Sequence, residues 1–561
     1  MTRDRFFIVF WIWRIFYSAV PRLLMAAVAW RRPGLCRGWF RALENGLSRL
    51  ARNYLTAGLL IFLISLTISI GLSMLVHWPG PVIADEFSYL LASDTFAHGR
   101  LTNPPHPMWR HFESLHIIQQ PTYASKYPPG QGLVMAAGQV LTGQAIAGVW
   151  VSVALACVAI FWMLLAFTRP RFALLGGLLA AIHPIILEWG QNYWGGAVAL
   201  GGGAIVIGAF QRLCHRTKIR DGLMLGAGLA ILANTRPFEG MVLALLLGLL
   251  TVFRLVRGEL HGLSRLILRV ALPAALILII AGGSMAFYNM RVSGHPLLMP
   301  YLLHEENYAV APAFVWQKPR PEPRYRHDSI RLFYTGYALE SYLVQKNLPG
   351  FIKKGLIRKI GILLRGYISN LAMAFPLLAL PWAWRRDKWL RVVMLTLAGF
   401  IAVLLTETWM VPHYAAPGAP LIFIAVVLCF RYLRAWKYRG QRTGLWLARA
   451  VVLFSLLGVV NLGFRLARDH RSTSLWADQR ARIQSTLEAD SALHLIIVRY
   501  GPEHITHQEW VFNSADPDRS RVIWAREMDQ TANQQLINYF PERKIWLLEA
   551  DQVPPTLKPF Q

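Results

Sequence analysis

Two adjacent carboxylates, Asp85 and Glu86, follow the first long apolar run of this sequence. A segment that begins with Lys126 and Tyr127 and continues with two prolines stands later in the same polar stretch. Carboxylates can move protons, and a cation beside a membrane can hold a phosphate. Both segments also have a structural explanation, because acids favour a helix N-terminus and lysines extend from apolar surfaces toward water. We expect the two segments to mark an active site.

Further polar and aromatic groups stand near the ends of later apolar runs. They are Tyr193, Trp194, Arg236, Glu239, His413 and Tyr414, with Tyr301, His304, Glu305 and Glu306 in a long polar stretch. Ionisable groups at membrane depth are costly to bury, so they favour a functional site. Arg236 could pair with Glu239, or its planar guanidinium could bind a phosphate. A single histidine such as His413 is more often structural, although its pKa near neutrality also suits catalysis.

The composition is that of a membrane protein. Of 561 residues 55% are hydrophobic, with 21 Trp and 28 Phe, whereas soluble domains contain about 45–50% apolar residues. A formal net charge of +28 would suggest nucleic-acid binding in a soluble protein. The basic residues stand in short segments between apolar runs, so we attribute them to membrane topology and expect no nucleic-acid partner. The four cysteines form no C-x-x-C motif, so no zinc or redox site is indicated.

Apolar runs long enough to cross a bilayer, about 20 residues, recur along the chain. We expect about eleven spans, at 54–76, 144–167, 172–189, 192–211, 221–235, 238–256, 267–289, 360–383, 390–410, 412–432 and 445–466. The ten arginines of residues 1–53 place the start of the first span in the cytoplasm. Short loops then alternate between basic and nearly uncharged, which places the C-terminus outside, in the periplasm or the extracellular space.

The predicted fold is therefore an all-α polytopic membrane protein with a small soluble α/β domain at its C-terminal end. We expect residues 1–53 to form a cytoplasmic segment with helices that lie on the membrane, and a broken extra span is the alternative. Residues 54–466 form the transmembrane domain, from which the loops 77–130 and 290–359 extend on the outer side. Residues 467–561 form the extracytoplasmic domain.

Three strands and a helix are expected in the C-terminal domain. The strands are Leu493–Arg499, Arg521–Ala525 and Lys544–Leu548, and the helix is Gln530–Tyr539. These residues contain no nucleophile paired with a base. We expect a structural or substrate-recruiting module there, and the chemistry in the transmembrane domain.

This arrangement resembles the GT-C superfamily of polytopic glycosyltransferases. It is most similar to the family 39/83-like group, which includes protein mannosyltransferases and the aminoarabinose transferase of lipid A. The resemblance rests on Asp85 and Glu86 after the first span, on the Lys-Tyr-Pro-Pro segment, on Trp194–Gly196 and Arg236–Gly240 in outer turns, and on His413–Pro417. Tyr127 departs from the Lys-Pro-Pro element of the family, because it separates the lysine from the prolines. The likeness covers residues 54–466.

The resemblance implies an inverting glycosyl transfer, on the outer face of a cell (inner) membrane, from a polyprenyl-phosphate-linked sugar. Asp85, or Glu86 in second place, would take the proton of the acceptor hydroxyl. Lys126, Arg236 and His413 would stabilise the charge on the leaving phosphate. The acceptor would be a glycan, a lipid or a protein. A divalent cation between carboxylates and phosphate is possible, although no ligand spacing requires one.

Two other functions fit parts of the sequence. A transporter or flippase of lipid-linked or small substrates would also need many spans, but it predicts internal repeats and polar groups at mid-membrane. The polar residues here stand at the ends of the spans instead. An oligosaccharide ligase would also use lipid-linked donors and would depend on the long loop 290–359, with Arg320, Arg324, Arg326 and Arg331.

Overall fold

The computed structural model describes residues 37–260, 262–368, 371–473 and 475–560, with positions 27 and 31. Most of the predicted interfacial N-terminal segment lies outside the described residues. Its last part is helix α2 (Arg37–Leu50), which exposes Trp39 and Leu43. Glu44 of α2 pairs with Arg434 at 2.8 Å and with Arg449 at 2.9 Å, so the helix is held against the helical bundle.

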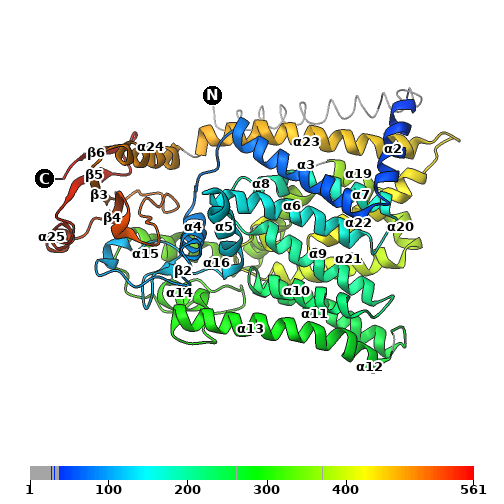
Figure 1. Cartoon of the computed structure of the whole chain (residues 1–561), viewed down its shortest axis with the longest axis horizontal. Coiled ribbons are helices and arrows are strands. Elements are labelled where there is room, and N and C mark those ends of the chain that lie inside the picture. The colour runs from blue at the N-terminus through cyan, green and yellow to red at the C-terminus, as the bar shows by residue number, and fades with distance from the viewer. Residues whose placement is uncertain are drawn as a thin grey trace.

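A bundle of helices runs along the long axis of the molecule (Figure 1). Its helices are α3 (Tyr54–Leu75), α6 (Ala145–Leu164), α7 (Pro170–Ala181), α8 (Pro184–Trp189), α9 (Gly196–Leu213), α10 (Ile219–Ala233), α11 (Pro237–Val256), α12 (Leu263–Leu266), α13 (Leu272–Ser293), α18 (Lys359–Tyr367), α19 (Leu371–Leu377), α20 (Leu380–Arg386), α21 (Lys388–Leu404), α22 (Pro420–Ala435) and α23 (Thr443–Thr473). Each predicted span overlaps at least one of them. Among the described residues, six helices are long and apolar enough to cross a membrane. The predicted polytopic membrane fold is confirmed, and the count of eleven spans remains a prediction.

Several predicted spans are broken in the structure. The span predicted at 172–189 divides into α7 and α8, because Pro184 lacks an amide hydrogen and disfavours helical backbone at His183. The span predicted at 412–432 begins as the 3-10 helix Pro412–Ala415, and α22 starts at Pro420. The span predicted at 360–383 consists of the shorter helices α18, α19 and α20.

The core of the bundle forms around α9, which packs against α6 and α10. Small residues allow these close approaches. A Cβ atom on Gly203 would lie 2.0 Å from the carbonyl oxygen of Pro417, and one on Gly208 would lie 2.5 Å from the ring of Trp162. The tight packing fixes where the ends of these helices lie, and the polar residues of the candidate site stand at those ends.

Two outer loops form a layer between the bundle and the C-terminal domain (Figure 1). The first loop contains α4 (Ala84–Ala97), the 3-10 helix Trp109–Phe112, β1 (Ile117–Ile118), β2 (Ala124–Ser125) and α5 (Pro129–Thr142). The long loop contains α14 (Pro300–Tyr308), α15 (Asp328–Arg331), the π-helix Leu332–Ala338, α16 (Leu339–Leu343), α17 (Leu348–Gly350) and the π-helix Phe351–Arg358. Figure 1 labels α2, α12 and α20 at the opposite end of the bundle.

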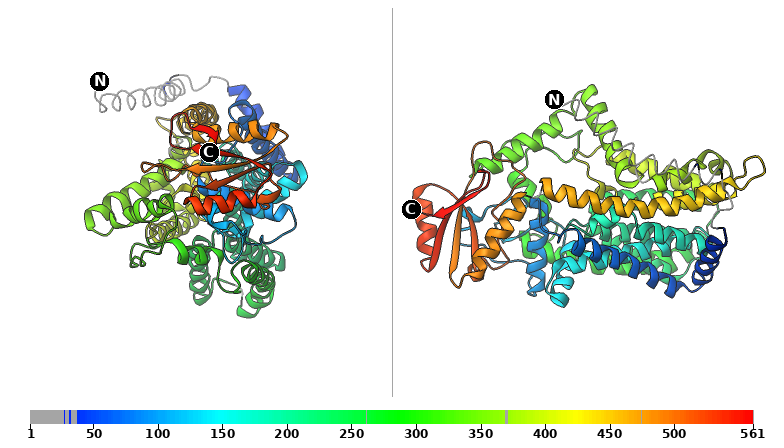
Figure 2. Two further views of the ribbon diagram at one scale, coloured as in Figure 1. Left: turned by 90° about the vertical axis from the view of Figure 1, so that its left-hand side faces the viewer. Right: turned by 90° about the horizontal axis from the view of Figure 1, so that it is seen from above.

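The C-terminal domain is a four-stranded sheet with helices on both faces, at one end of the long axis (Figure 2). Its elements are α24 (Leu475–Ala489), β3 (Leu493–Arg499), the 3-10 helix Pro517–Arg519, β4 (Val522–Arg526), α25 (Gln530–Tyr539), β5 (Arg543–Glu549) and β6 (Thr556–Pro559). The strand order is β4-β3-β5-β6, with β6 antiparallel to its neighbour. The predicted α/β domain is confirmed, including β3 and α25 at their predicted bounds. Helix α24 and strand β6 were not predicted from the sequence.

Candidate active site

Asp85 and Glu86 stand in the first turn of α4. Successive residues of a helix point about 100° apart, since one turn takes 3.6 residues. The two carboxylates therefore face different surroundings. The side chain of Asp85 is 35% exposed, whereas Glu86 is 3% exposed.

Glu86 is held by the backbone. Its Oε2 accepts a hydrogen bond from the amide of Val82 at 2.7 Å, and its Oε1 accepts one from the amide of Tyr193 at 3.0 Å. Burial raises the pKa of Glu86 to about 7, against the lowering effect of these amides. Glu86 thus joins the start of α4 to the turn before α9, and each of its oxygens accepts a backbone hydrogen bond.

Asp85 has two side-chain partners in the first outer loop. The hydroxyl of Tyr127 donates a hydrogen bond to Oδ1, and Nε2 of His116 lies 3.6 Å from Oδ2. Burial and the charge of Asp85 hold the pKa of Tyr127 well above its usual value, so its hydroxyl stays a donor. Tyr127 is further fixed by stacking on Tyr89, with ring centroids 4.3 Å apart. Asp85 is therefore positioned from both sides while part of it stays accessible.

His116 has an unusual backbone. Its φ of 64° lies in the left-handed region, which is costly for a residue other than glycine. The conformation is stabilised because its carbonyl oxygen accepts from the hydroxyl of Ser88 at 2.7 Å and from the amide of Lys126 at 3.3 Å. Burial, with the charges of Lys126 and His507, lowers the pKa of His116 well below its usual value. A neutral imidazole consequently faces Asp85.

The start of α5 brings several outer turns together. The amide of Gly130 donates to the carbonyl oxygen of Asn234 at 2.8 Å, and the side chain of Gln131 donates to the carbonyl oxygen of Tyr193 at 3.2 Å. A Cβ atom on Gly130 would lie 2.6 Å from the Asn234 oxygen, so glycine is required for this approach. These bonds place Tyr127 beside the turns that carry Tyr193 and Arg236.

Lys126 lies in an aromatic and acidic setting. Its Nζ is 5.4 Å from the ring centre of Tyr127, 5.1 Å from that of Tyr301 and 3.6 Å from Oε1 of Glu305. Tyr301 and Glu305 belong to α14, so the long loop closes over this side of the site. The cation predicted to hold a phosphate is thus already close to one carboxylate.

A second cation stands between two membrane helices. The guanidinium of Arg236 lies 4.5 Å from the ring centre of Tyr414, and its Nη1 is 3.6 Å from Oε1 of Glu239. Trp194 and His413 pack against each other with ring centroids 4.5 Å apart. In the described part of the chain, Nε1 of Trp194 and Nδ1 of His413 are buried without a hydrogen-bond partner. This side of the site therefore combines a cation with an unused N–H donor.

The structure thus brings the predicted residues together in two groups. One comprises Asp85, Tyr127 and Lys126 with the buried Glu86 and Tyr193, and the other comprises Trp194, Arg236, Glu239, His413 and Tyr414. Glu188 of α8, which is near Tyr193 in the sequence, pairs with Arg465 of α23. In the long loop, Arg326 pairs with Glu113 and Arg331 with Glu322.

Sequence reasoning missed His116 and the contribution of the C-terminal domain. The ring of His507 lies 4.5 Å from that of Tyr337 and 5.6 Å from that of Phe333, and Phe333 in turn packs on His116 at 5.4 Å. Burial lowers the pKa of His507, and the charge of Asp85 opposes this. Only the shared outer placement of these residues could have suggested their proximity. Within the described ranges no three His, Cys, Asp or Glu side chains gather as metal ligands.

Comparison with known proteins shows the fold. No family model and no curated protein matches the sequence. ArnT from Cupriavidus metallidurans in the apo state aligns with a TM-score of 0.51 and 11% identity, over 88% of this chain and 91% of ArnT. The same protein bound to undecaprenyl phosphate aligns with a TM-score of 0.48 and 11% identity, over 88% of this chain and 92% of ArnT. The apo oligosaccharyltransferase of Archaeoglobus fulgidus aligns with a TM-score of 0.47 and 10% identity, over 88% of this chain and 69% of the oligosaccharyltransferase. The likeness to apo ArnT shows that the chain shares the overall fold of that protein, in agreement with the fold that the GT-C resemblance predicts.

Proposed function

We propose that this chain is a membrane glycosyltransferase that moves a sugar from a polyprenyl-phosphate donor to an acceptor hydroxyl, with inversion. Asp85 acts as the base and the cations at the helix ends bind the donor phosphate. The observation that carries the proposal is Asp85 itself, a partly exposed carboxylate held from both sides at the ends of apolar helices. The shared fold with ArnT, a protein that has been crystallised with undecaprenyl phosphate, agrees with this class of reaction.

The proposed step moves one proton and one sugar. Asp85 takes the proton of the acceptor hydroxyl as its oxygen attacks the anomeric carbon of the donor. The bond between that carbon and the phosphate oxygen breaks on the opposite face, so the polyprenyl phosphate leaves with the electron pair. Tyr127 and His116 keep the carboxylate oriented, which places much of the rate gain in positioning.

The negative charge that develops on the leaving phosphate requires donors placed in advance. Arg236 is the first candidate, because its planar guanidinium suits a phosphate and its neighbour Trp194 has an unused N–H. Lys126 is the second, and its partner Glu305 balances its charge. Glu86 and Tyr193 have a positioning role, because they hold α4 against the turn before α9.

The membrane topology that we propose for the chain rests on the charges of its loops. The N-terminus lies in the cytoplasm, and the outer loops and the C-terminal domain lie on the far side of a cell inner membrane. The transmembrane unit is residues 54–466, preceded by the interfacial segment 1–53 and followed by the domain 467–561. The helices α2, α12 and α20, which neighbour basic segments, stand at the end of the bundle opposite the C-terminal domain (Figure 1).

The test is transfer by the purified full chain in lipid nanodiscs. Undecaprenyl-phosphate-linked hexoses serve as donors, a membrane-lipid and glycan extract serves as the acceptor, and release of undecaprenyl phosphate is measured. Asp85→Asn should lower kcat by about 10²- to 10⁴-fold, the range for loss of a general base. The matched variant Glu306→Gln removes an exposed carboxylate from the same outer layer and should retain the rate. Undiminished transfer by folded Asp85→Asn would contradict the assignment of the base.

A further inference from the structure

A cavity of about 330 Å³ lies between the two outer loops. Its walls include Trp109, Glu113 and Gln119 of the first loop and His304, Tyr308 and Arg326 of the long loop. Its volume lies at the lower end of the range for small-molecule sites. None of its lining residues belongs to a predicted membrane span, so the cavity faces the aqueous side of the molecule rather than the lipid.

Several buried polar atoms around this cavity have no hydrogen-bond partner among the described residues. They are Oε2 of Glu113, Oε1 of Gln119 and both ring nitrogens of His304. The three side chains are 2%, 3% and 1% exposed. Buried polar groups are normally satisfied, because leaving them unpaired costs free energy. Their concentration at one cavity points to a polar ligand that supplies the missing partners.

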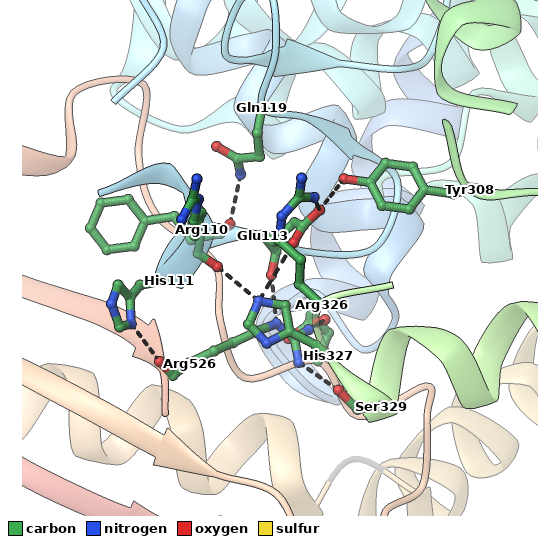
Figure 3. Close-up of polar contacts among 11 residues, drawn as sticks. Arg110, His111, Glu113, Gln119, Tyr308, Arg326, His327, Ser329 and Arg526 are labelled. Carbon is green, nitrogen blue, oxygen red and sulfur yellow. Dashed lines mark hydrogen bonds and ion pairs between the residues drawn. The ribbon is translucent and has the colours of Figure 1, made fainter. Parts of the chain in front are cut away.

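Neighbouring groups fix the orientation of Glu113 and Gln119 (Figure 3). Oε1 of Glu113 accepts from the hydroxyl of Tyr308 at 2.6 Å and from Arg326 at 3.3 Å, while Oε2 lies 3.5 Å from Nε2 of His327. The amide nitrogen of Gln119 donates to the carbonyl oxygen of Phe112 at 2.6 Å, which leaves its Oε1 as an acceptor. The site is therefore already formed, with two acceptor oxygens held in place.

The unused atoms select a class of ligand. Burial, with the charges of Lys126 and His116, lowers the pKa of His304 well below its usual value, so its neutral ring offers one donor and one acceptor. A hydroxyl both donates and accepts, and can satisfy all of these atoms. A phosphate is negatively charged near neutral pH, so the Glu113 carboxylate and the carbonyl oxygen of Gln119 would repel it. The unpaired atoms of the cavity therefore match a hydroxyl-rich ligand and do not match an anion.

The cavity also adjoins the catalytic candidate. The ring of His304 lies 6.0 Å from that of His116, whose Nε2 is 3.6 Å from Oδ2 of Asp85. A ligand in the cavity is thus separated from Asp85 by two imidazole rings. The phosphate-binding candidates Arg236 and Trp194 stand on membrane helices or beside them, whereas the cavity is formed by loops.

We infer that this cavity is a saccharide subsite, in which a sugar residue of the acceptor is bound through its hydroxyl groups to Glu113, Gln119 and His304. The assignment of the bound sugar to the acceptor rests on the proposed function, whereas saccharide binding at the cavity does not. The bound residue is a neighbour of the sugar or lipid group that carries the reacting hydroxyl. The proposal therefore narrows the acceptor to a glycan or glycolipid.

The experiment uses the full chain in nanodiscs and saturation-transfer NMR with methyl glucoside, methyl mannoside and methyl N-acetylglucosaminide as probes. His304→Phe keeps the ring contacts with His116 and Tyr308 and removes both nitrogens. The control Tyr334→Phe removes a buried hydroxyl that also lacks a partner, 6.2 Å away between ring centroids. At least one glycoside should give a signal with the wild type and with Tyr334→Phe that falls at least tenfold with His304→Phe.

Transfer kinetics provide the second readout. His304→Phe should raise the acceptor KM at least tenfold and leave kcat within about threefold, because the cavity binds and does not react. Asp85→Asn should keep the glycoside signal while it loses transfer. The glycoside signal therefore tests the cavity even if the proposed transferase function is wrong. Absence of any glycoside signal with the wild type, a signal unchanged in His304→Phe, or displacement of the glycoside by inorganic phosphate would each overturn the proposal.

Discussion

The amide of Gly130 donates a hydrogen bond to the carbonyl oxygen of Asn234, with 2.8 Å between the two atoms. This bond joins the start of α5 to the turn that carries Arg236. Tyr127, the partner of Asp85, stands three residues before Gly130. The base candidate and the phosphate-binding candidate are therefore placed relative to each other through one backbone contact.

Gly130→Ala should disrupt this placement. The new Cβ atom would lie 2.6 Å from the Asn234 oxygen and 2.7 Å from the side chain of Thr235, so the turn must shift. We expect a loss of about 1–3 kcal/mol in stability, as for overpacking elsewhere, with transfer reduced at least tenfold, about 1.4 kcal/mol in barrier. Gly248→Ala in α11 is the control, because no atom lies within 4 Å of its Cβ position. Thermal unfolding and transfer assays measure the two effects, and equal behaviour of the two variants would contradict the prediction.

Tyr127→Phe should slow transfer without unfolding the protein. It removes the hydrogen bond to Asp85, and bonds to charged groups contribute about 1.5–3 kcal/mol. The expected fall in kcat is about tenfold or more, since about 1.4 kcal/mol corresponds to a factor of ten. Tyr89→Phe keeps the stacking partner of Tyr127 and should change kcat less than about twofold, well under 1 kcal/mol in barrier. A Tyr127→Phe enzyme as fast as the wild type would show that Asp85 needs no such positioning.

The Arg236–Glu239 pair predicts a rescue of folding without a rescue of function. Arg236→Gln alone leaves the carboxylate of Glu239 buried and unpaired, and breaking a buried pair costs about 3–5 kcal/mol. Arg236→Gln combined with Glu239→Gln removes that charge and should restore the melting temperature. The double variant should still show a raised KM for the undecaprenyl-phosphate donor, because the guanidinium is missing. Normal donor KM in the double variant would remove Arg236 from the phosphate site.

Glu86 should make stability depend on pH. Its pKa is raised from 4.5 to about 7 in the folded chain, so the folded state binds the proton more tightly than the unfolded state. The resulting stabilisation is fully present below about pH 4.5 and is lost as the pH rises through about 7. Its size is about 3 kcal/mol, since one pKa unit corresponds to about 1.4 kcal/mol.

Glu86→Gln should remove this dependence, which melting temperatures between pH 5 and 8 would measure. Glu306→Gln is the matched control, because Glu306 is exposed on α14 and should leave the profile unchanged. If the melting temperature changes with pH in the same way in the wild type and in Glu86→Gln, groups other than Glu86 cause the pH dependence.

Much of the bundle could be predicted because hydrophobic length is a local property of the sequence. The start of the first span at Tyr54, the strand Leu493–Arg499 and the helix Gln530–Tyr539 were predicted correctly, because each has a local pattern of apolar residues. The division of the third span at Pro184 was missed, because an apolar run remains apolar whether or not its helix breaks. The strand Thr556–Pro559 was missed since it is short and ends in proline, which a sheet accepts only at its edge.

The candidate site was predicted in part. The alternation of loop charges predicted that Asp85, Lys126, Arg236 and His413 lie at one end of the bundle. The hydrogen bonds and ring contacts around these residues agree with that placement. The different surroundings of Asp85 and Glu86 could not be predicted from their neighbouring positions in the sequence, because they depend on which side of α4 faces the turn before α9. His116 and the saccharide cavity depend on irregular loops, which carry no periodicity and meet only in the folded chain.

Arg526 of β4 donates to the carbonyl oxygen of Glu113 at 2.5 Å and to the hydroxyl of Ser329 at 2.6 Å (Figure 3). It also pairs with Glu509. One side chain near the end of the polypeptide thus joins both outer loops. A polypeptide is synthesised from its N-terminus, so the bundle and the outer loops exist before this contact can form. The bundle and the two outer loops therefore remain without this link until β4 has been synthesised and has packed against them.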